Sequence, residues 1–277
     1  MPIVTISRGS MSGGQNLAQC LAEALQVPCV GREIVLEAAA KLGVSDQVLA
    51  AKLERSPSFW DRLTSERRIY VAAVQAALAE HAASGNLLYH GYAGHLLLAG
   101  VPAVLRVRLI APLEKRIQAV IESQGLDRSE AEAYIRKVDE ERVRWTRMVY
   151  GVDLRDPALY DLVINLDVMS LQSACATVVE AVHQPEYLVT PEVLRELADF
   201  ALASRVRLAL AVNPTGRGLN LQVQARDGVV TVSGELPQAI TLTRVSTRWE
   251  QEFTNVVQGV PGVKGVRFDL EPVSGYR

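Results

Sequence analysis

The architecture of the chain follows from one segment near its start, Ile3-Val-Thr-Ile-Ser-Arg-Gly-Ser-Met-Ser-Gly-Gly-Gln-Asn16. An apolar run over 2–6 precedes a glycine- and serine-rich cluster over 8–14, and apolar residues at helical spacing follow over 17–25. This order predicts a strand, a glycine turn and a helix. The outer glycines of the turn keep the spacing of the phosphate-loop sequence Gly-x-x-x-x-Gly-Lys-Ser/Thr.

The glycine turn is suited to bind a phosphate group, because glycines let successive backbone N–H groups face one anion at the positive end of the helix. The motif's lysine is replaced by Gln15 and its hydroxyl residue by Asn16, so the turn lacks the usual charge and a good magnesium ligand. From spacing alone, a glycine turn that binds no ligand is the alternative. The residues predicted to bind nucleotide phosphates are Gly9, Ser10, Ser12, Gly13, Gly14, Gln15 and Asn16.

Strands and helices alternate beyond this turn. Short apolar runs over 86–91, 103–110 and 160–167 predict strands. The pattern predicts helices over 33–41, 46–54, 62–83, 112–122, 129–150 and 171–182. Such alternation is typical of an α/β fold, in which a parallel sheet is flanked by helices on both faces.

The composition excludes several classes of protein. The 277 residues carry 29 basic and 31 acidic side chains, a formal charge of −2, so no general or sequence-specific nucleic-acid binding is expected. No apolar run approaches the ~20 residues of a membrane span, and the N-terminal residues turn polar too early for a signal peptide. Cys20, Cys29 and Cys175 form no Cys-x-x-Cys pair, so we expect neither a disulfide framework nor a zinc site. The expectation is a soluble, cytoplasmic protein.

The residue pattern changes around 184–191, where two prolines bracket a linker. A helix over 191–203 is predicted, followed by alternating strands on either side of Arg226-Asp227-Gly228, a helix over 238–258 and a last strand. This α+β pattern differs from the α/β pattern before it. We therefore predict two domains, over 1–184 and 190–277.

Four collinear parts of the chain resemble the cytidylate-kinase-like family of P-loop nucleoside-monophosphate kinases. They are SRGSMSGGQNLAQCLAEAL (7–25), VGREIVLEAA (30–39), NLLYHGYAGHLLL with AVLRVRLIAPLEKRI (86–117), and VDEERVRWTRMVYGVDLRDPALYDLVINLD (138–167). The resemblance covers about residues 1–183. It implies a P-loop kinase fold, transfer of a phosphoryl group from ATP to CMP or dCMP, and Mg²⁺ that arrives with the nucleotide.

The resemblance assigns the charged helix over 129–150 to a lid that closes over the phosphates. Asp139 and Arg142 match the family's Asp-x-x-Arg, and their three-residue spacing places both on one helical face. The resemblance implies that Arg142 and Arg147 are catalytic and stabilise the transferring group. From the charge pattern alone, a solvated helix laced with ion pairs is the alternative.

The chain departs from the family at three positions that usually carry charge. Gln15 stands where a basic residue follows the double glycine, Gly31 stands where an acidic residue precedes Arg-Glu, and Tyr92 stands where the central turn carries arginine. Phosphoryl transfer depends on positioning and electrostatic stabilisation. These departures favour a second hypothesis, an inactive nucleotide-sensing or scaffold protein whose C-terminal domain carries the output.

The segment after 190 resembles a BON domain, a small α+β module usually taken to bind membranes, lipids or proteins. The resemblance lies in RDGVVTVSGEL (226–236) and VVQGVPGVKGVRFDL (256–270). It implies a lipid or protein partner, and a packing or dimerisation module is the alternative. The alanine-rich stretch over 70–83 indicates a helix–helix contact, either within one chain or in a homo-oligomer.

Two histidines, His90 and His95, flank a glycine-containing turn at the end of a predicted strand, where open α/β sheets bind ligands. No carboxylate stands beside them in the sequence, and their five-residue spacing is not that of a helical metal pair. We interpret them as ordinary turn histidines and predict no metal site.

Overall fold

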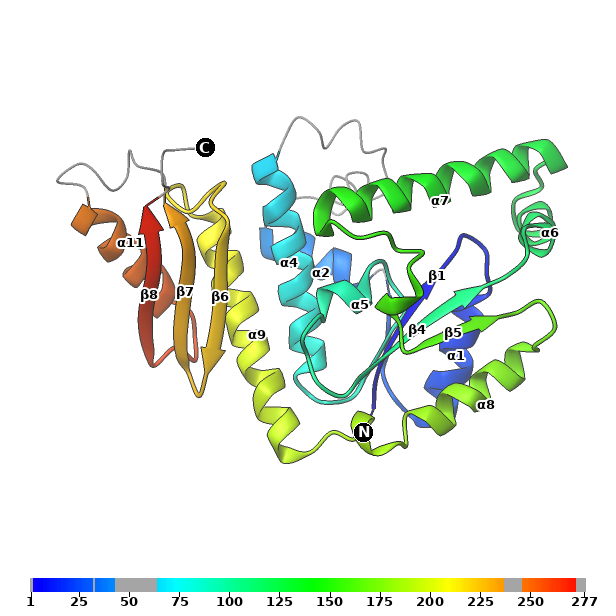
Figure 1. Cartoon of the computed structure of the whole chain (residues 1–277), viewed down its shortest axis with the longest axis horizontal. Helices are drawn as coiled ribbons and strands as arrows, with labels where there is room; N and C mark the ends of the chain where they lie inside the picture. The colour runs from blue at the N-terminus through cyan, green and yellow to red at the C-terminus, as the bar shows by residue number, and fades with distance from the viewer. Residues whose placement is uncertain (1, 32, 43–63, 237–245, 273–277) are drawn as a thin grey trace. The chain divides into compact units, whose positions relative to one another are not determined.

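The computed structural model describes residues 2–31, 33–42, 64–236 and 246–272, and the chain forms two compact units (Figure 1). The first unit contains Met1–Glu33 and Gly85–Thr190, and the second contains Ile34–Ser84 and Pro191–Arg277. Each unit therefore joins segments that are distant in sequence. The helix predicted over 46–54 lies outside the described residues.

The first unit is built on a five-stranded parallel sheet in the order β2-β3-β1-β4-β5. Because β1 lies at its centre, Ile3 pairs with Leu87 on one side and Val104 on the other. The parallel sheet predicted from the alternating pattern is confirmed. Its strands are β1 (Ile3–Arg8), β2 (Cys29–Val30), β3 (Leu87–Tyr89), β4 (Val104–Ile110) and β5 (Leu162–Asn165).

One face of this sheet is covered by α1 (Gly14–Leu25) and α8 (Leu171–Ala181), which pack side by side (Figure 1). Every second residue of β1 and β4, such as Val4 and Leu105, is buried against the two helices because side chains alternate between the faces of a strand. Sequence patterning of this kind locates the core without any tertiary information.

A disulfide joins Cys20 of α1 to Cys175 of α8. The expectation that the cysteines form no disulfide is therefore wrong. The sequence gives no sign of the pairing, because the two residues are 155 positions apart and meet only when both helices pack on the same sheet face. Cys29 has no disulfide partner and is exposed.

The other elements of the first unit connect the strands and bring charged side chains to their carboxyl ends. The long helix α7 begins with a capping box, in which Asp127 accepts from the Glu130 amide while the Glu130 carboxylate accepts from the Asp127 amide. No described helix of the chain is long and apolar enough to cross a membrane. The connecting elements are α5 (Gly94–Leu97), α6 (Leu113–Gln124), α7 (Arg128–Tyr150) and the 3₁₀ turns η2 (Pro157–Leu159) and η3 (Pro185–Tyr187).

The second unit contains a three-stranded mixed sheet in the order β6-β7-β8, with β6 and β7 antiparallel and β7 and β8 parallel. The predicted turn at 226–228 is confirmed, since Asp227 and Gly228 both adopt positive φ between the paired residues Arg226 and Val229. Its elements are α2 (Glu33–Leu42), α4 (Thr64–Ala82), α9 (Pro191–Val212), β6 (Leu221–Arg226), β7 (Val229–Leu236), α11 (Ser246–Gln258) and β8 (Gly265–Pro272).

The alanine-rich helix α4 packs against α9 within this second unit. The side chains of Ala73, Ala76 and Ala77 are fully buried, because small residues let two helices approach closely. The predicted helix–helix contact is thus present within one chain. The division into domains over 1–184 and 190–277 stays a prediction, while the compact unit that contains α9 also contains α4.

Candidate functional site

The glycine turn over 9–14 connects the carboxyl end of β1 to the start of α1. Gly13 caps the helix at φ +76° and Met11 has φ +56°, so the backbone curls in a conformation that glycine adopts readily. No side chain caps the first amides of α1, and its first turn holds no acidic residue. The turn therefore presents free N–H groups and the positive end of a helix to an anion.

A buried hydroxyl faces the interior of this turn. Ser12 is only 2% exposed, and its Oγ has no hydrogen-bond partner among the described residues. A Cβ atom at Gly9 would lie 2.9 Å from this Oγ, so the hydroxyl points across the turn. A buried polar group without a partner is rare and marks a place where a ligand or water completes the bonding.

Gln15 and Asn16 lie in the first turn of α1, and both side chains are exposed. Neither therefore closes the turn in the way a phosphate-loop lysine would. Their assignment to nucleotide binding, like that of the backbone over 9–14, stays a prediction.

Helix α7, called the lid helix after the role that the family resemblance implies for it, reaches the turn through Asp139. The Asp139 carboxylate accepts a hydrogen bond from the Ser10 backbone N–H at 3.0 Å. Arg116 of α6 donates to the Ser10 carbonyl at 2.6 Å and to the other Asp139 oxygen at 2.5 Å. The Asp139 carboxylate thus accepts from a backbone N–H of the turn that could otherwise donate to a phosphate. Arg116 is not among the predicted site residues; its place in the first turns of the helix predicted over 112–122, which follows a predicted strand, was the available signal.

Two arginines approach the turn, and neither has a carboxylate partner among the described residues. Arg142 Nη1 donates to the Arg8 carbonyl at 3.3 Å. Burial, and the nearby Arg142 guanidinium, lower the pKa of Arg8. No described carboxylate forms an ion pair with Arg8 or Arg142. Two like charges held together at a glycine turn favour the binding of an anion between them.

Arg147 is placed differently from Arg142. Its Nη2 donates to Asp153 at 2.5 Å, and Arg155 also binds this carboxylate at 2.6 Å. The hydrogen bonds from Arg155, together with that from Arg147, lower the pKa of Asp153. The structure therefore brings Arg142 to the turn and holds Arg147 at Asp153.

Two departures from the family pattern are explained by packing. The Tyr92 hydroxyl donates to the Arg142 carbonyl at 2.7 Å and lies 2.8 Å from Thr146 Oγ1, so this side chain anchors the lid helix. A Cβ atom at Gly31 would lie 2.6 Å from Nε2 of His90. A side chain at 31 would therefore require the imidazole ring of His90 to move.

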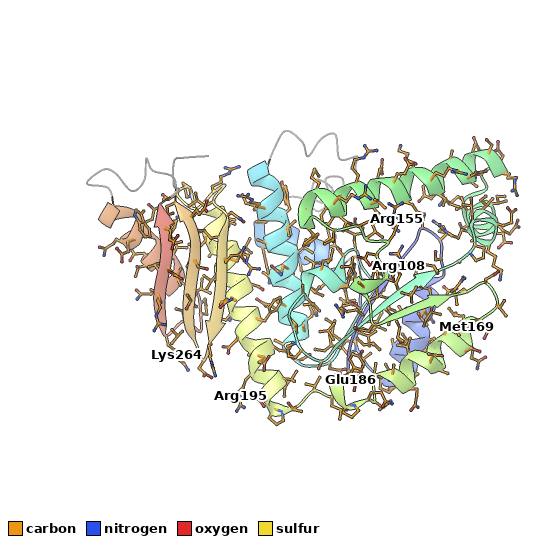
Figure 2. All side chains as sticks on the ribbon, viewed as in Figure 1. Arg108, Arg155, Met169, Glu186, Arg195 and Lys264 are labelled. Carbon is orange, nitrogen blue, oxygen red and sulfur yellow. A yellow bond between two sulfur atoms is a disulfide. The ribbon has the colours of Figure 1, made fainter. Side chains whose placement is uncertain are left out.

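His95 lies in a buried cluster beside the central strands. Its ring stacks on Tyr160 at 4.6 Å between centroids, and both ring nitrogens lack a hydrogen-bond partner among the described residues. Arg108, labelled in Figure 2, is buried and donates to the Leu154 carbonyl at 2.7 Å and to the Tyr160 hydroxyl at 3.1 Å. Burial, with the guanidiniums of Arg108 and Arg106, lowers the pKa of His95 to about 4.

Acid is expected to destabilise the protein through His95. The unfolded chain, with an imidazole pKa near 6.5, binds a proton that folded His95 does not accept above about pH 4. The stabilisation is complete above about pH 6.5, and about 2 kcal/mol of unfolding free energy is lost by about pH 5. Urea unfolding at several pH values measures this slope. His95→Gln should reduce it, and the exposed-site control His183→Gln should not; an unchanged slope in His95→Gln would refute the assignment.

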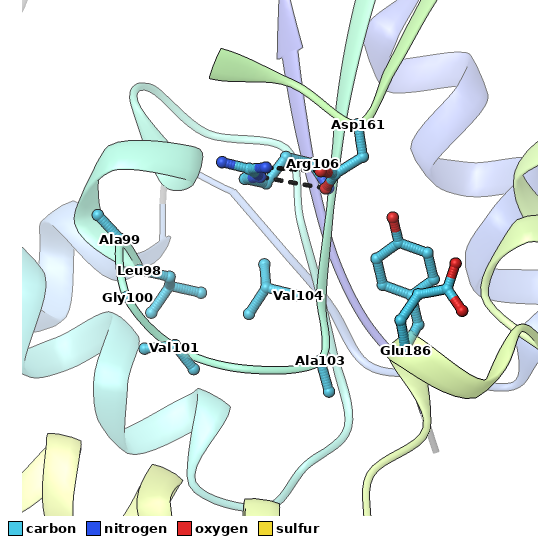
Figure 3. A pocket seen from close by; sticks show the side chains of 10 residues that line it. Leu98, Ala99, Gly100, Val101, Ala103, Val104, Arg106, Asp161 and Glu186 are labelled. Carbon is cyan, nitrogen blue, oxygen red and sulfur yellow. Dashed lines mark hydrogen bonds and ion pairs between the residues drawn. The ribbon is translucent and has the colours of Figure 1, made fainter. Parts of the chain in front are cut away.

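A cavity of about 340 Å³ lies beside the start of β4 (Figure 3). Because Ile3 pairs with Val104 at the start of both parallel strands, the glycine turn lies at the other end of β1. Two of the cavity's charged lining residues already pair with each other, because Arg106 Nη2 donates to Asp161 at 2.6 Å. The described residues contain no group of three His, Cys, Asp or Glu side chains that could hold a metal ion. The glycine turn is therefore the stronger candidate site.

The chain is similar to two archaeal cytidylate kinases. The cytidylate kinase from Methanothrix thermoacetophila is 30% identical over 165 residues, which cover 59% of this chain and 87% of that protein. The cytidylate kinase from Methanopyrus kandleri is 30% identical over 166 residues, covering 59% of this chain and 83% of that protein.

A crystal structure of an uncharacterized protein from Eubacterium ventriosum shares the fold, with a TM-score of 0.51 and 18% identity over 66% of this chain and 98% of that one. The family model for the cytidylate kinase-like family matches residues 3–168, which include the glycine turn, all five strands of the parallel sheet and the lid helix. By this match and the similarity to the archaeal enzymes, the chain belongs to the cytidylate kinase-like family.

Proposed function

We propose that the chain is a nucleotide kinase that transfers the γ-phosphoryl group of ATP to CMP or dCMP. The observation that carries the proposal is the glycine turn, with its uncapped amides and with a Ser12 hydroxyl and two arginines that find no partner or carboxylate among the described residues. The family match supports phosphoryl transfer between nucleotides. The choice of a cytidine acceptor rests on the activity for which the archaeal relatives are named.

In this proposal the backbone amides over 9–14 bind the phosphates of ATP, and the Ser12 hydroxyl donates a further hydrogen bond. Arg142 stabilises charge on the transferring group, since fixed cations at a developing charge are a main source of phosphoryl-transfer catalysis. No described cluster of acidic side chains fits a metal cage, so Mg²⁺ would be held chiefly by phosphate oxygens and water. When bound, Mg²⁺ neutralises phosphate charge.

The same residues indicate slow turnover. Gln15 supplies no positive charge to the phosphates, and its side chain is exposed. Asp139 holds the Ser10 amide, so a phosphate that takes this amide must first displace a carboxylate. Both features weaken binding of the nucleotide and lower the rate.

An inactive nucleotide-sensing or scaffold protein is the second candidate, favoured by the anchoring of Tyr92 where the family carries arginine. The described elements from α9 to β8 run helix, strand, strand, helix, strand, which supports a BON-like module as its output domain. A lipid or protein partner of this module is tested by vesicle cosedimentation and by affinity capture with the full chain. Light scattering tests a homo-oligomer.

Coupled ADP release with CMP and dCMP, alongside calorimetry with ATP, tests the proposed function. We expect ATP binding and a turnover below about 1 s⁻¹, near the low end of ordinary enzyme rates. AMP and UMP are the comparison acceptors. Binding of ATP with no transfer to any acceptor would favour the sensing protein, and absence of ATP binding would contradict both candidates.

A further inference from the structure

The glycine turn lacks a lysine at its usual position, yet an arginine side chain crosses the same region. A Cβ atom at Gly14 would collide with Cδ of Arg8 and would lie 3.2 Å from Cγ and 3.3 Å from Cβ of this side chain. The aliphatic part of Arg8 therefore lies against the first residue of α1. Gln15, the residue at the lysine position, comes directly after this contact.

The described residues around Arg8 supply no anion. Its guanidinium is partly buried, and the charged group that most affects it is the guanidinium of Arg142, which lowers its pKa together with burial. His90 feels the Arg8 charge as well, and burial with this charge lowers the pKa of its imidazole. No described carboxylate neutralises the pair of arginines. Such an arrangement is unfavourable unless an anion binds beside it.

The Ser12 hydroxyl gives an independent indication of the same ligand. It is buried, unpartnered and directed across the turn toward Gly9, so it offers a hydrogen bond that the protein itself does not use. A phosphate group accepts hydrogen bonds from both hydroxyls and guanidiniums.

We propose that Arg8 replaces the missing phosphate-loop lysine and binds the terminal phosphates of a nucleoside triphosphate. The inference rests on the proposed function for its ligand. The cation comes from the end of β1 instead of the first turn of α1, and the glycine at 14 leaves the space that the side chain needs. Because a guanidinium is planar and carries several N–H groups, it binds two phosphate oxygens at once.

A binding role and a structural role predict opposite effects on the free protein. If Arg8 only stabilises the fold, Arg8→Gln lowers the melting temperature whether or not a ligand is present. If Arg8 is a ligand-binding cation, removing it relieves repulsion with Arg142. The melting temperature without ligand then stays the same or rises, and the increase on adding inorganic tripolyphosphate is lost.

The test uses the full chain and measures the binding of ATP and inorganic tripolyphosphate by calorimetry. We expect Arg8→Gln to weaken both ligands by about 10- to 100-fold, and Arg8→Lys to retain most of the affinity. Gln15→Lys in the Arg8→Gln background should recover most of the loss, and Gln15→Lys alone should add little. The control Arg136→Gln removes an exposed arginine that pairs with Glu132 and should leave affinity unchanged.

Binding by Arg8→Gln within about 3-fold of the parent, or no recovery by Gln15→Lys, would overturn the proposal. Parallel assays of CMP phosphorylation separate it from the proposed function. A parent protein that binds tripolyphosphate through Arg8 but transfers no phosphoryl group would retain this inference and refute kinase activity. An active parent whose Arg8→Gln variant binds normally would support kinase activity and refute the role of Arg8. A parent that binds neither ATP nor tripolyphosphate would refute the proposed function and the role of Arg8 together.

Discussion

Gly14→Val is expected to weaken ATP binding by about 100-fold, or about 3 kcal/mol, because the new side chain would occupy the space that Arg8 uses. The Cβ atom alone collides with the Arg8 side chain, and the two methyl groups of valine fill the turn further. The substitution removes the Arg8 cation from the phosphates and blocks the approach of the anion to the backbone amides. Calorimetry with ATP and tripolyphosphate measures the loss.

The fold should survive this substitution. Gly14 begins α1 with helical backbone geometry, and the displaced neighbour is a flexible side chain, so the free energy of unfolding should change by less than about 1 kcal/mol. Ala24→Val adds two of these three carbon atoms to the exposed side of α1 and should leave ATP affinity unchanged. If Gly14→Val binds ATP as tightly as the parent does, the glycine turn is not the phosphate site.

Arg142→Gln is expected to lower kcat at saturating ATP and CMP by about 10²–10³-fold, the cost of removing one fixed donor from a developing charge. The substitution should keep helix α7 in place, because Tyr92 binds the Arg142 backbone carbonyl and not its side chain. Steady-state rates from coupled ADP release give kcat and KM separately.

Two other arginines of α7 make this experiment specific. Arg136→Gln removes the same charge from an exposed ion pair with Glu132 and should change kcat by less than about 2-fold. Arg147→Gln should cost less than Arg142→Gln, since Arg147 is held by Asp153. A drop of under about 5-fold in Arg142→Gln would show that this residue does not contact the transferring group. A larger loss in Arg147→Gln would show that the lid rearranges before transfer.

Local patterns in the sequence predicted most of the parallel-sheet fold. The apolar alternation of β1 and β4, and the glycine turn before α1, depend on residues that are neighbours in the chain. Helix α7 was predicted over 129–150 and is observed as Arg128–Tyr150, because its start is encoded by the nearby Asp127 and Glu130. The prediction that Arg142 lies near the phosphates needed the family resemblance, since its charge pattern also fits a solvated helix.

Only the tertiary structure revealed the groups that surround the glycine turn. Arg8 and Arg116 come from the ends of different elements, and Asp139 reaches the Ser10 amide from a position 129 residues away. No short sequence window contains two of these partners together. Their contacts depend on distances between side chains and on burial, and the hydrophobic periodicity of the sequence does not determine these distances.

The same limit explains the disulfide and the grouping of α4 with α9. Hydrophobic periodicity determines which face of a helix is buried, and the sequence by itself was sufficient to predict that the helix over 62–83 packs against another helix. It could not identify α9 as the partner, nor Cys175 as the partner of Cys20. Whether a helix face is buried follows from the residue pattern of that helix alone. Which segment packs against it depends on how segments far apart in the chain come together.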